Sequence, residues 1–224
     1  MRNVRKAPVS RRDRPAKPPL SREGVVAVSL RIMRDEGLEK VTMRRIAAEL
    51  DTGPASLYVY VENVAELHGA LLDELLRDLP EHDDPIGLLS AYTMMLNRYP
   101  SLARSILLLR PAGPRYLRLI DTVLGMLLAD GVPPRPAAWG VDLLLQMATA
   151  SAAEHGGQEQ PAGQQQIEAV KEADPADFPH VDRVREELFS GTGEERQRWA
   201  FAAAIAGMKS TAGAQSAAAA ARPA

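Results

Sequence analysis

Arginine, serine and tyrosine side chains gather on two short predicted helices between residues 42 and 60. Arg44 and Arg45 adjoin the apolar Ile46 and Ala47, so at least one guanidinium group must face outward. A guanidinium group can donate two hydrogen bonds to guanine O6 and N7, or it can bind a phosphate. This chemistry predicts a helix-turn-helix that enters the major groove of DNA. The alternative is an ordinary helical corner whose arginines are solvated.

Two short helices and a turn must position these side chains. Thr42 is predicted to cap a helix over residues 43–50, and a turn follows at residues 51–53. Pro54 suits the first position of a second helix, over residues 54–61, because the N–H that proline lacks is unpaired there. Small residues at the start of the second helix would let it approach the bases closely.

Two longer helices flank this pair. The first is predicted to begin at a Ser21 cap and to end at Gly37, because glycine is favoured just after a helix. The second opens at Asn63 with Glu66 three residues later, which is the pattern of a capping box, and Pro80 ends it.

Composition predicts an all-α fold without catalytic or metal sites. The 224 residues are 46% hydrophobic but only 4% aromatic, whereas strands favour aromatic and β-branched residues. The chain has no cysteine, and its four histidines lack ligand spacing, so we expect no metal or other cofactor. Glu154 beside His155, and the acidic group of Asp182, Glu186 and Glu187, have no nucleophile nearby in the sequence. We therefore expect no enzymatic activity.

Positive charge is concentrated at the N-terminal end, although the formal net charge of the chain is −2. Residues 1–19 hold 7 Lys and Arg against 1 acidic residue, and residues 1–50 hold 13 against 6. Such a basic, proline-rich segment predicts a disordered tail over residues 1–20 that contacts DNA phosphates. A solubilising tail is the equal alternative. No signal peptide or membrane span is recognisable, so we expect a cytoplasmic protein.

Apolar periodicity, prolines and glycines divide the rest of the chain into further helices. They predict a DNA-binding head at residues 21–64, a helical body at residues 65–208, a flexible loop at residues 155–165 and a frayed tail at residues 209–224. The predicted body helices cover residues 85–98, 101–109, 115–130, 137–154, 166–173, 181–189 and 194–208.

Two of these body helices carry apolar residues on two sides and must bury both. One side would face the core of the body and the other a second copy of the chain, which predicts a homodimer. The alternative is a fully internal helix in a monomer. The residues predicted to form the dimer interface are Trp139, Leu143, Trp199, Ala203 and Ala206.

Methionine and tyrosine side chains in the body predict a ligand pocket between helices. They offer an adaptable apolar lining with some hydroxyl groups. The same residues at helical spacing also suit a plain core. The candidate ligand-binding residues are Tyr92, Met95, Tyr99, Tyr116, Gln146 and Met147.

The segment with the clearest pattern is residues 42–67, which read TMRRIAAELDTGPASLYVYVENVAEL. It resembles the N-terminal domain of the tetracycline-repressor (TetR) family, whose pattern is Thr, two residues, Ile-Ala, Leu-Gly-Val, then Leu-Tyr-x-His-Val-x-x-Lys. The resemblance extends over about residues 21–79. It implies a three-helix DNA-binding domain joined to a helical body that binds an effector and dimerises through its last long helices.

The resemblance also implies which side chains meet DNA. Thr42, Met43 and Arg44 match the groove-edge contacts of the family, and the second helix matches its recognition helix. With the neighbouring Arg45 and with Arg22, the predicted DNA contacts are Thr42, Met43, Arg44, Arg45, Pro54, Ala55, Ser56, Tyr58, Val59, Tyr60 and Arg22.

The sequence departs from the family pattern at several positions. Asp51 stands where the family has glycine, and Tyr60 replaces its histidine. Val64 replaces a lysine that reaches a phosphate, and Glu62 adds a negative charge beside it. We therefore expect the basic N-terminal tail and Arg22 to supply phosphate contacts instead.

These observations predict a ligand-responsive transcriptional regulator of the repressor type. It would bind a palindromic operator as a homodimer and leave it when a small-molecule effector binds. The alternative is a ligand-independent DNA-binding or partner-binding scaffold or activator.

Overall fold

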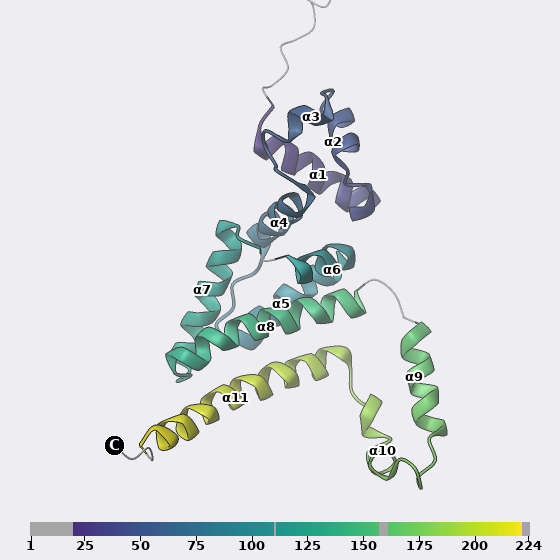
Figure 1. Ribbon diagram of the computed structural model, residues 1–224, viewed down its shortest axis with the longest axis vertical. Helices are drawn as coiled ribbons and strands as arrows, with labels where there is room; N and C mark the ends of the chain where they lie inside the picture. Colours follow the sequence, from purple (N-terminus) through teal and green to yellow (C-terminus); the bar gives the residue numbers. More distant parts are fainter. Residues whose placement is uncertain (1–19, 110, 157–160, 221–224) are drawn as a thin grey trace, which may run out of the picture.

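The chain is helical over the part that the structure describes. The computed structural model describes residues 20–109, 111–156 and 161–220, and these contain no β-strand. The first three helices form a head at one end, and the later helices form a body beneath it (Figure 1). The all-α fold predicted from composition is therefore confirmed.

The first helix of the head has the predicted boundaries. α1 (Arg22–Glu36) begins at Ser21, whose hydroxyl group accepts a hydrogen bond from the first turn, and it ends at Gly37. The φ angle of Gly37 is +94°, which glycine adopts without the steric cost that a side chain would bring. A 3-10 turn, η2 (Leu38–Lys40), follows it and was not predicted.

The second helix of the head is α2 (Met43–Glu49). Thr42 caps it as predicted, since its hydroxyl oxygen accepts a hydrogen bond from the Arg45 N–H at 3.2 Å. The turn after it contains Asp51 with a φ angle of +48°. Aspartate tolerates this left-handed conformation better than most residues do. Asp51 can therefore occupy the position at which the tetracycline-repressor family pattern has glycine.

The third helix, α3 (Pro54–Leu57), is shorter than the predicted helix over residues 54–61. The N–H groups of Tyr60 and Val61 both donate to the Leu57 carbonyl oxygen, at 2.9 and 3.1 Å. The chain therefore closes into a turn instead of extending the helix. This turn carries the Val61 side chain into the hydrophobic core.

A fourth helix, α4 (Val64–Leu75), connects the head to the body and is extended by a 3-10 turn, η3 (Leu76–Asp78). The Asn63 side chain caps α4 by accepting from the Glu66 N–H at 2.8 Å. The Glu66 carboxylate accepts from the Glu62 N–H at 2.6 Å, one residue earlier than a standard capping box requires. Since α4 packs against α1, α6 and α7, any movement of α4 must involve both parts of the molecule.

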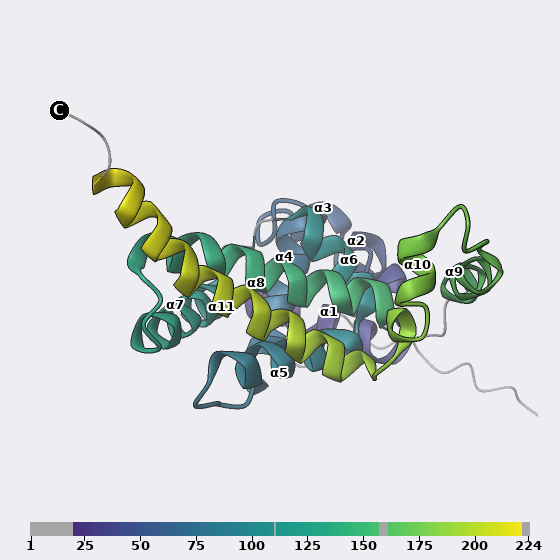
Figure 2. The same ribbon diagram turned by 90° about the horizontal axis from the view of Figure 1, so that it is seen from below.

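The body is built around one long helix, α8. It packs against α5, α6, α7 and α11, and Figures 1 and 2 both show α11 lying along it. α5 to α8 each begin with a proline. The start predicted for α5 is correct, whereas those predicted for α6, α7 and α8 were late. Pro100 and Pro134, which were read as helix breakers, occupy first turns. The bounds of these helices are α5 (Pro85–Asn97), α6 (Pro100–Leu108), α7 (Pro114–Ala129), α8 (Pro134–His155) and α11 (Gly193–Ala220).

The segment between α8 and α11 stands beside the body (Figure 1). It contains α9 (Pro161–Glu172), α10 (Pro179–Arg183) and a 3-10 turn, η4 (Glu187–Phe189). The helix predicted over residues 181–189 is therefore replaced by α10 and η4. The predicted loop at residues 155–165 is shorter, because α9 begins at Pro161 with proline in a first turn.

The last helix is longer than predicted. α11 continues to Ala220, so residues 209–220, which were expected to form a frayed tail, extend it. Alanine has the highest helix propensity of all residues, and this segment is rich in it. Earlier in α11, the buried side chains of Phe201 and Ile205 attach the helix to the body.

Candidate nucleic-acid interface and body pocket

The exposed face of α2 and α3 carries most of the predicted DNA-contacting side chains. Val59, just after α3, is 80% exposed although it is apolar, and the other residues are exposed except Met43, which is buried, and Arg45 and Tyr60, which are half-buried. Small exposed residues at the start of α3 leave room for a close approach to a duplex. The exposed members are Thr42, Arg44, Pro54, Ala55, Ser56, Tyr58 and Val59.

The structure corrects the prediction for Met43. Its side chain is only 8% exposed and belongs to the hydrophobic core. As the first residue of α2, Met43 lies three residues before the buried Ile46, so the two side chains share the inner face of the helix. A side-chain contact from Met43 to DNA is therefore not available in this conformation.

Arg44 and Arg45 differ in what they already contact. The Arg45 guanidinium forms ion pairs with Glu36 at 2.8 Å and with Glu49 at 2.6 Å, and Glu36 raises the pKa of Arg45. Arg44 is exposed, and within the described residues its side chain has no hydrogen-bond or ion-pair partner. We therefore rank Arg44 above Arg45 as a group that binds DNA.

The start of α4 offers no cation to a phosphate. Glu62 and Val64 are both exposed, as the departures from the family pattern predicted. Arg22 is exposed as well, but its guanidinium lies 3.2 Å from the Glu66 carboxylate and so joins α1 to α4. Residues 1–19, which hold the basic tail, lie outside the described part of the chain.

A pocket of about 340 Å³ opens between α6, α7 and α8 in the body. Two of the predicted ligand-binding residues, Tyr116 and Gln146, line it. Burial raises the pKa of Tyr116, and the nearby Asp142 carboxylate raises it further, so the phenol stays neutral and can donate a hydrogen bond. The full lining consists of Ile106, Leu107, Leu108, Leu109, Pro111, Tyr116, Ile120, Val141, Asp142, Leu145, Gln146 and Thr149.

The other predicted ligand residues do not reach this pocket. Tyr92 is completely buried, and its hydroxyl oxygen lies 3.2 Å from that of Thr149, which it supports from behind the pocket wall. Met95, Tyr99 and Met147 are half-buried and pack against the core. Their apolar side chains therefore serve packing here, which is the plain-core alternative considered from the sequence.

Sequence reasoning missed Asp142 and Thr149 as pocket residues. With Leu145 and Gln146 they form one stripe of α8, at spacings of three and four residues. That spacing was visible in the sequence. What was not visible is that α6 and α7 leave this stripe, and not the neighbouring one, facing a pocket.

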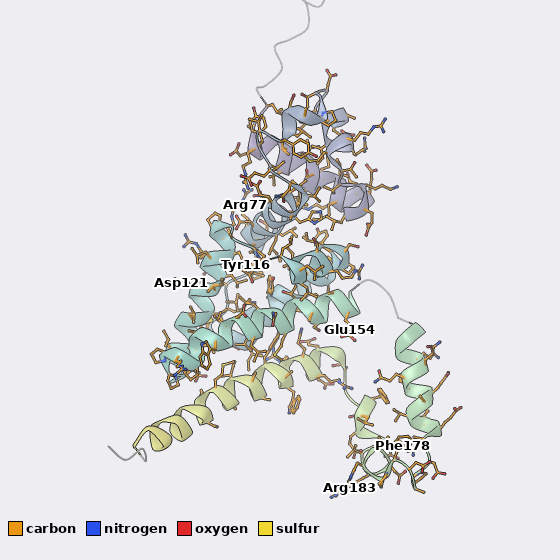
Figure 3. All side chains as sticks on the ribbon, viewed as in Figure 1. Arg77, Tyr116, Asp121, Glu154, Phe178 and Arg183 are labelled. Atoms are coloured by element: carbon orange, nitrogen blue, oxygen red, sulfur yellow. The ribbon has the colours of Figure 1, made fainter. Side chains whose placement is uncertain are left out.

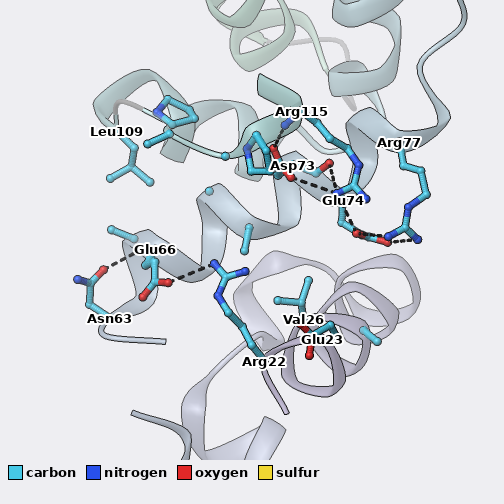
Figure 4. Close-up of a pocket in the computed structure, with 18 residues that line it drawn as sticks. Arg22, Glu23, Val26, Asn63, Glu66, Asp73, Glu74, Arg77, Leu109 and Arg115 are labelled. Atoms are coloured by element: carbon cyan, nitrogen blue, oxygen red, sulfur yellow. Dashed lines mark hydrogen bonds and ion pairs between the residues drawn. The ribbon is translucent and has the colours of Figure 1, made fainter. Parts of the chain in front are cut away.

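A second, larger groove of about 1010 Å³ lies between the head and the body (Figure 4). It runs between α1, α4 and the segment that joins α6 to α7. Figure 3 labels Arg77, which lies in η3, and Tyr116, which lies in α7, near the place where the head meets the body. The groove was not predicted, because its walls come from segments far apart in the sequence.

The residues predicted to form a dimer interface are all exposed in the single chain. Trp199 is 73% exposed and Trp139 is 62% exposed, although tryptophan is usually well buried. Leu143, Ala203 and Ala206 are exposed as well. The opposite stripe of α8 is buried against the body, so α8 is apolar on two sides and only one of them is covered.

A half-buried histidine contact joins α4 to α6 and is expected to make the stability of the chain depend on pH. His68 Nδ1 lies 2.7 Å from the Ser105 hydroxyl oxygen, and burial lowers the pKa of His68 below its ordinary value of 6.5. The unfolded chain therefore takes up this proton at a higher pH than the folded one. The contribution of His68 to the free energy of unfolding is therefore fully present above about pH 6.5, and it decreases as the pH falls below that value.

We expect His68→Gln to make the melting temperature less dependent on pH between 7.5 and 5.5. Glutamine keeps a polar contact with Ser105 but does not titrate. Differential scanning calorimetry at the two pH values measures the effect, and His180→Gln, at an exposed position of α10, is the control. The carboxylates with lowered pKa values, such as Glu49, lose their contribution only below the ordinary value of 4.5. An equal pH dependence in wild type and His68→Gln would contradict the prediction.

The described residues include no helix with the length and apolar character needed to cross a membrane. Among the same residues, no group of three or more histidine or acidic side chains could hold a metal ion.

Comparisons with known proteins agree on one family. The family model for the tetracyclin repressor-like C-terminal domain matches residues 89–212. The chain is 47% identical to SCO7704 from Streptomyces coelicolor, with a TM-score of 0.74 over 86% of this chain and 96% of that one. It is 29% identical to ActR from Streptomyces coelicolor in complex with actinorhodin, with a TM-score of 0.71 over 88% of this chain and 100% of that one.

A curated repressor also matches part of the chain. Over 67 residues the chain is 46% identical to the HTH-type transcriptional repressor DrrR1 of Streptomyces coeruleorubidus, which is 30% of this chain and a quarter (25%) of that protein. The exposed two-helix face on a three-helix head, joined by α4 to a helical body, defines a helix-turn-helix DNA-binding protein. The chain belongs to the tetracycline-repressor family of transcriptional regulators.

Proposed function

We propose that the protein represses transcription as a homodimer on a near-palindromic operator and is released by a small-molecule effector. The observation that carries the proposal is the exposed Arg44, which has no partner among the described residues, beside the small residues that open α3. These groups are available to bind a duplex. The neighbouring Arg45 and Arg31 are less available, because they form ion pairs with glutamate carboxylates. We assign DNA binding to residues 21–64 and effector binding and dimerisation to residues 65–208.

The proposed DNA contacts are divided by chemistry. Arg44 would read a base edge or bind a phosphate, and Tyr58 would donate its hydroxyl hydrogen to a phosphate. The apolar Ala55 and Val59 can touch a thymine methyl group. Arg22 would contact a phosphate only if it exchanged its ion pair with Glu66, which is exposed and therefore weak.

The proposed dimer joins the uncovered faces of α8 and α11 to their symmetry copies. Two exposed tryptophans and a surface of alanines suit a four-helix interface, because a twofold axis lets one patch pair with itself. A twofold dimer also places two heads for two half-sites about one helical turn apart on DNA.

The proposed effector site is the pocket between α6, α7 and α8. Its apolar walls with the Tyr116 hydroxyl, the Asp142 carboxylate and the Gln146 amide suit a compact, mostly apolar molecule that carries hydroxyl groups. ActR, at 29% identity, has been solved with actinorhodin, so actinorhodin is the first probe to test. The two DNA-binding heads of the dimer would have two relative positions, one that fits the operator and one that does not. The effector would act only because its own affinity for the protein differs between these two positions.

Selection from a random DNA library tests the proposal. We expect enrichment of a near-palindromic duplex that binds the protein more tightly than a scrambled duplex in fluorescence anisotropy. Actinorhodin and a panel of hydroxylated aromatic compounds are then screened by thermal shift, and the compounds that bind are added to the complex. No enriched sequence would refute DNA recognition. Compounds that bind without changing DNA affinity would favour the ligand-independent scaffold or activator.

We expect deletion of residues 1–19 to weaken operator binding and to reduce its salt dependence. Each phosphate contact that is lost lowers the slope of log K against log salt by about 1. Anisotropy titrations at several salt concentrations measure the slope. A variant with Arg11, Arg12 and Arg14 changed to glutamine separates charge from length. An unchanged affinity and slope in both variants would leave the tail a solubilising segment.

A further inference from the structure

The N-terminus of α7 is capped by a residue from another helix. Gly113 occupies the cap position and has no side chain, and Pro114 has no N–H. The Asp73 carboxylate of α4 supplies the missing acceptor: its Oδ1 accepts from the Arg115 N–H at 2.7 Å and from the Tyr116 N–H at 3.1 Å. A cap side chain within α7 would bind the same two N–H groups.

The same carboxylate also binds a guanidinium group. Arg115 Nη1 lies 3.1 Å from Asp73 Oδ2, 3.4 Å from the Asp73 carbonyl oxygen and 3.5 Å from Glu74 Oε2 (Figure 4). Asp73 is only 7% exposed, so its carboxylate is largely sheltered from water, whereas the Arg115 side chain is 36% exposed. Gly113 is required for it, because a Cβ atom there would overlap the Asp73 carboxylate.

This contact lies between the effector pocket and the head. Leu109 and Pro111 line both the body pocket and the groove beneath the head, so the segment joining α6 to α7 separates the two. Tyr116 lines the body pocket with its side chain and donates its N–H to Asp73. One residue of the pocket wall is therefore attached directly to α4.

The other end of α4 is attached to the head. The Arg22–Glu66 ion pair joins α1 to the first turn of α4, and Leu67 and Leu71 are buried in the core. α4 therefore contacts the head near its start and the pocket wall near its end. A displacement of Asp73 changes the position of the whole helix, since a packed helix moves as a unit.

We infer that Asp73 is the positioning residue that sets α4, and with it the DNA-binding head, relative to the wall of the body pocket. This inference rests on the proposed function, because it assigns the residue through which that pocket and the DNA-binding face would be coupled. Asp73 touches neither the pocket nor the DNA-binding face. It acts through the backbone of Arg115 and Tyr116.

The absence of cysteine from the chain allows a direct measurement of head position. Ala48→Cys, on the exposed side of α2, carries a spin label in each head of the homodimer, and Arg118→Cys, exposed on α7, carries one in each body. Double electron–electron resonance then gives the head-to-head and body-to-body distances. Should the wild type be monomeric, labels at both positions of one chain report the head-to-body distance.

We expect Asp73→Asn to shift or broaden the head-to-head distance while the body-to-body distance stays as in wild type. Asparagine replaces the charged acceptor of the two α7 N–H groups with a neutral and weaker one, and it also loses the charge that holds the Arg115 guanidinium. Gly113→Ala, which displaces the same carboxylate from the other side, should have the same effect. Arg115→Met removes only the guanidinium and should give a smaller change. Asp73→Asn combined with Arg115→Met should equal Asp73→Asn alone, since both remove one ion pair.

Asp121→Asn, at an exposed position of α7, is the matched control and should leave both distances unchanged. On the selected duplex, Asp73→Asn should change affinity by about 5- to 150-fold, the usual range for coupled sites. A folded Asp73→Asn dimer with wild-type head-to-head distance would overturn the inference. That measurement needs neither DNA nor effector, so its failure is distinct from a failure of the proposed function.

Discussion

Replacing Trp199 with glutamate is expected to convert the proposed homodimer into monomers. Trp199 is 73% exposed on α11 in the single chain, and in the proposed dimer it would be a central aromatic anchor. Truncation of such an anchor typically costs about 2–4 kcal/mol, which is roughly a 30- to 1000-fold weaker association. Glutamate adds the cost of burying a charge without a partner. Sedimentation equilibrium across a range of protein concentrations measures the dissociation constant.

The control is Leu117→Glu. Leu117 is also a large, exposed apolar residue, but it lies on α7, away from the proposed interface. This variant should remain dimeric and bind the selected duplex as the wild type does. Because one head contacts only one half-site, the Trp199→Glu monomer should also lose most of its operator affinity. A Trp199→Glu protein that stays dimeric would show that the dimer interface lies elsewhere. Trp139→Glu tests the contribution of α8 to the interface separately.

Arg44→Ala is expected to weaken operator binding by about 1–3 kcal/mol for each half-site in which the residue reads a base. The guanidinium is exposed and has no partner among the described residues, so little of the loss reflects folding. If Arg44 contacts a base edge, discrimination against substitutions at one operator position should fall as well. If it contacts a phosphate, affinity should fall for all sequences and the salt slope should decrease. Anisotropy on single-substitution duplexes distinguishes these outcomes.

Two variants serve as controls for Arg44→Ala. Arg118→Ala removes an exposed arginine from the body and should leave DNA affinity unchanged. Arg45→Ala removes the arginine that already pairs with Glu36 and Glu49, and it should cost less operator affinity than Arg44→Ala. Equal losses from both arginine variants of α2 would show that the ion pairs do not restrain Arg45. No loss from Arg44→Ala would remove this residue from the binding surface.

The residues at the start of α4 explain why Arg44 and the basic tail were chosen for the tests of DNA binding. Val64 and Glu62 stand where the family pattern supplies a phosphate-binding lysine and its surroundings, and both are exposed. Arg22, the nearest cation on α1, is engaged with Glu66. We therefore propose that phosphate binding comes from elsewhere, and we test Arg44 and the basic tail that precedes α1 in the sequence. The tail deletion and Arg44→Ala therefore divide the electrostatic contribution between them.

The pocket shows where prediction from residue type fails. Tyr92 and Tyr116 are both tyrosines on body helices, yet Tyr92 is fully buried and Tyr116 lines the pocket. Helical spacing can place a residue on a face of its own helix. It cannot say whether a neighbouring helix fills the space opposite that face. Asp142 was passed over for the same reason, because an acid on a helix is usually solvated.

By itself the sequence determined the features that depend on neighbours within a few residues. Capping at Ser21, Thr42, Asn63 and Asp84, the order of most helices and the helix-turn-helix motif are of this kind, because a cap bonds an N–H three residues away. Only the tertiary structure decided the burial of Met43, the early end of α3 and the Asp73 cap on α7. These depend on segments as much as 42 residues apart, as Asp73 and Arg115 are, and their meeting is set by the packing of whole helices.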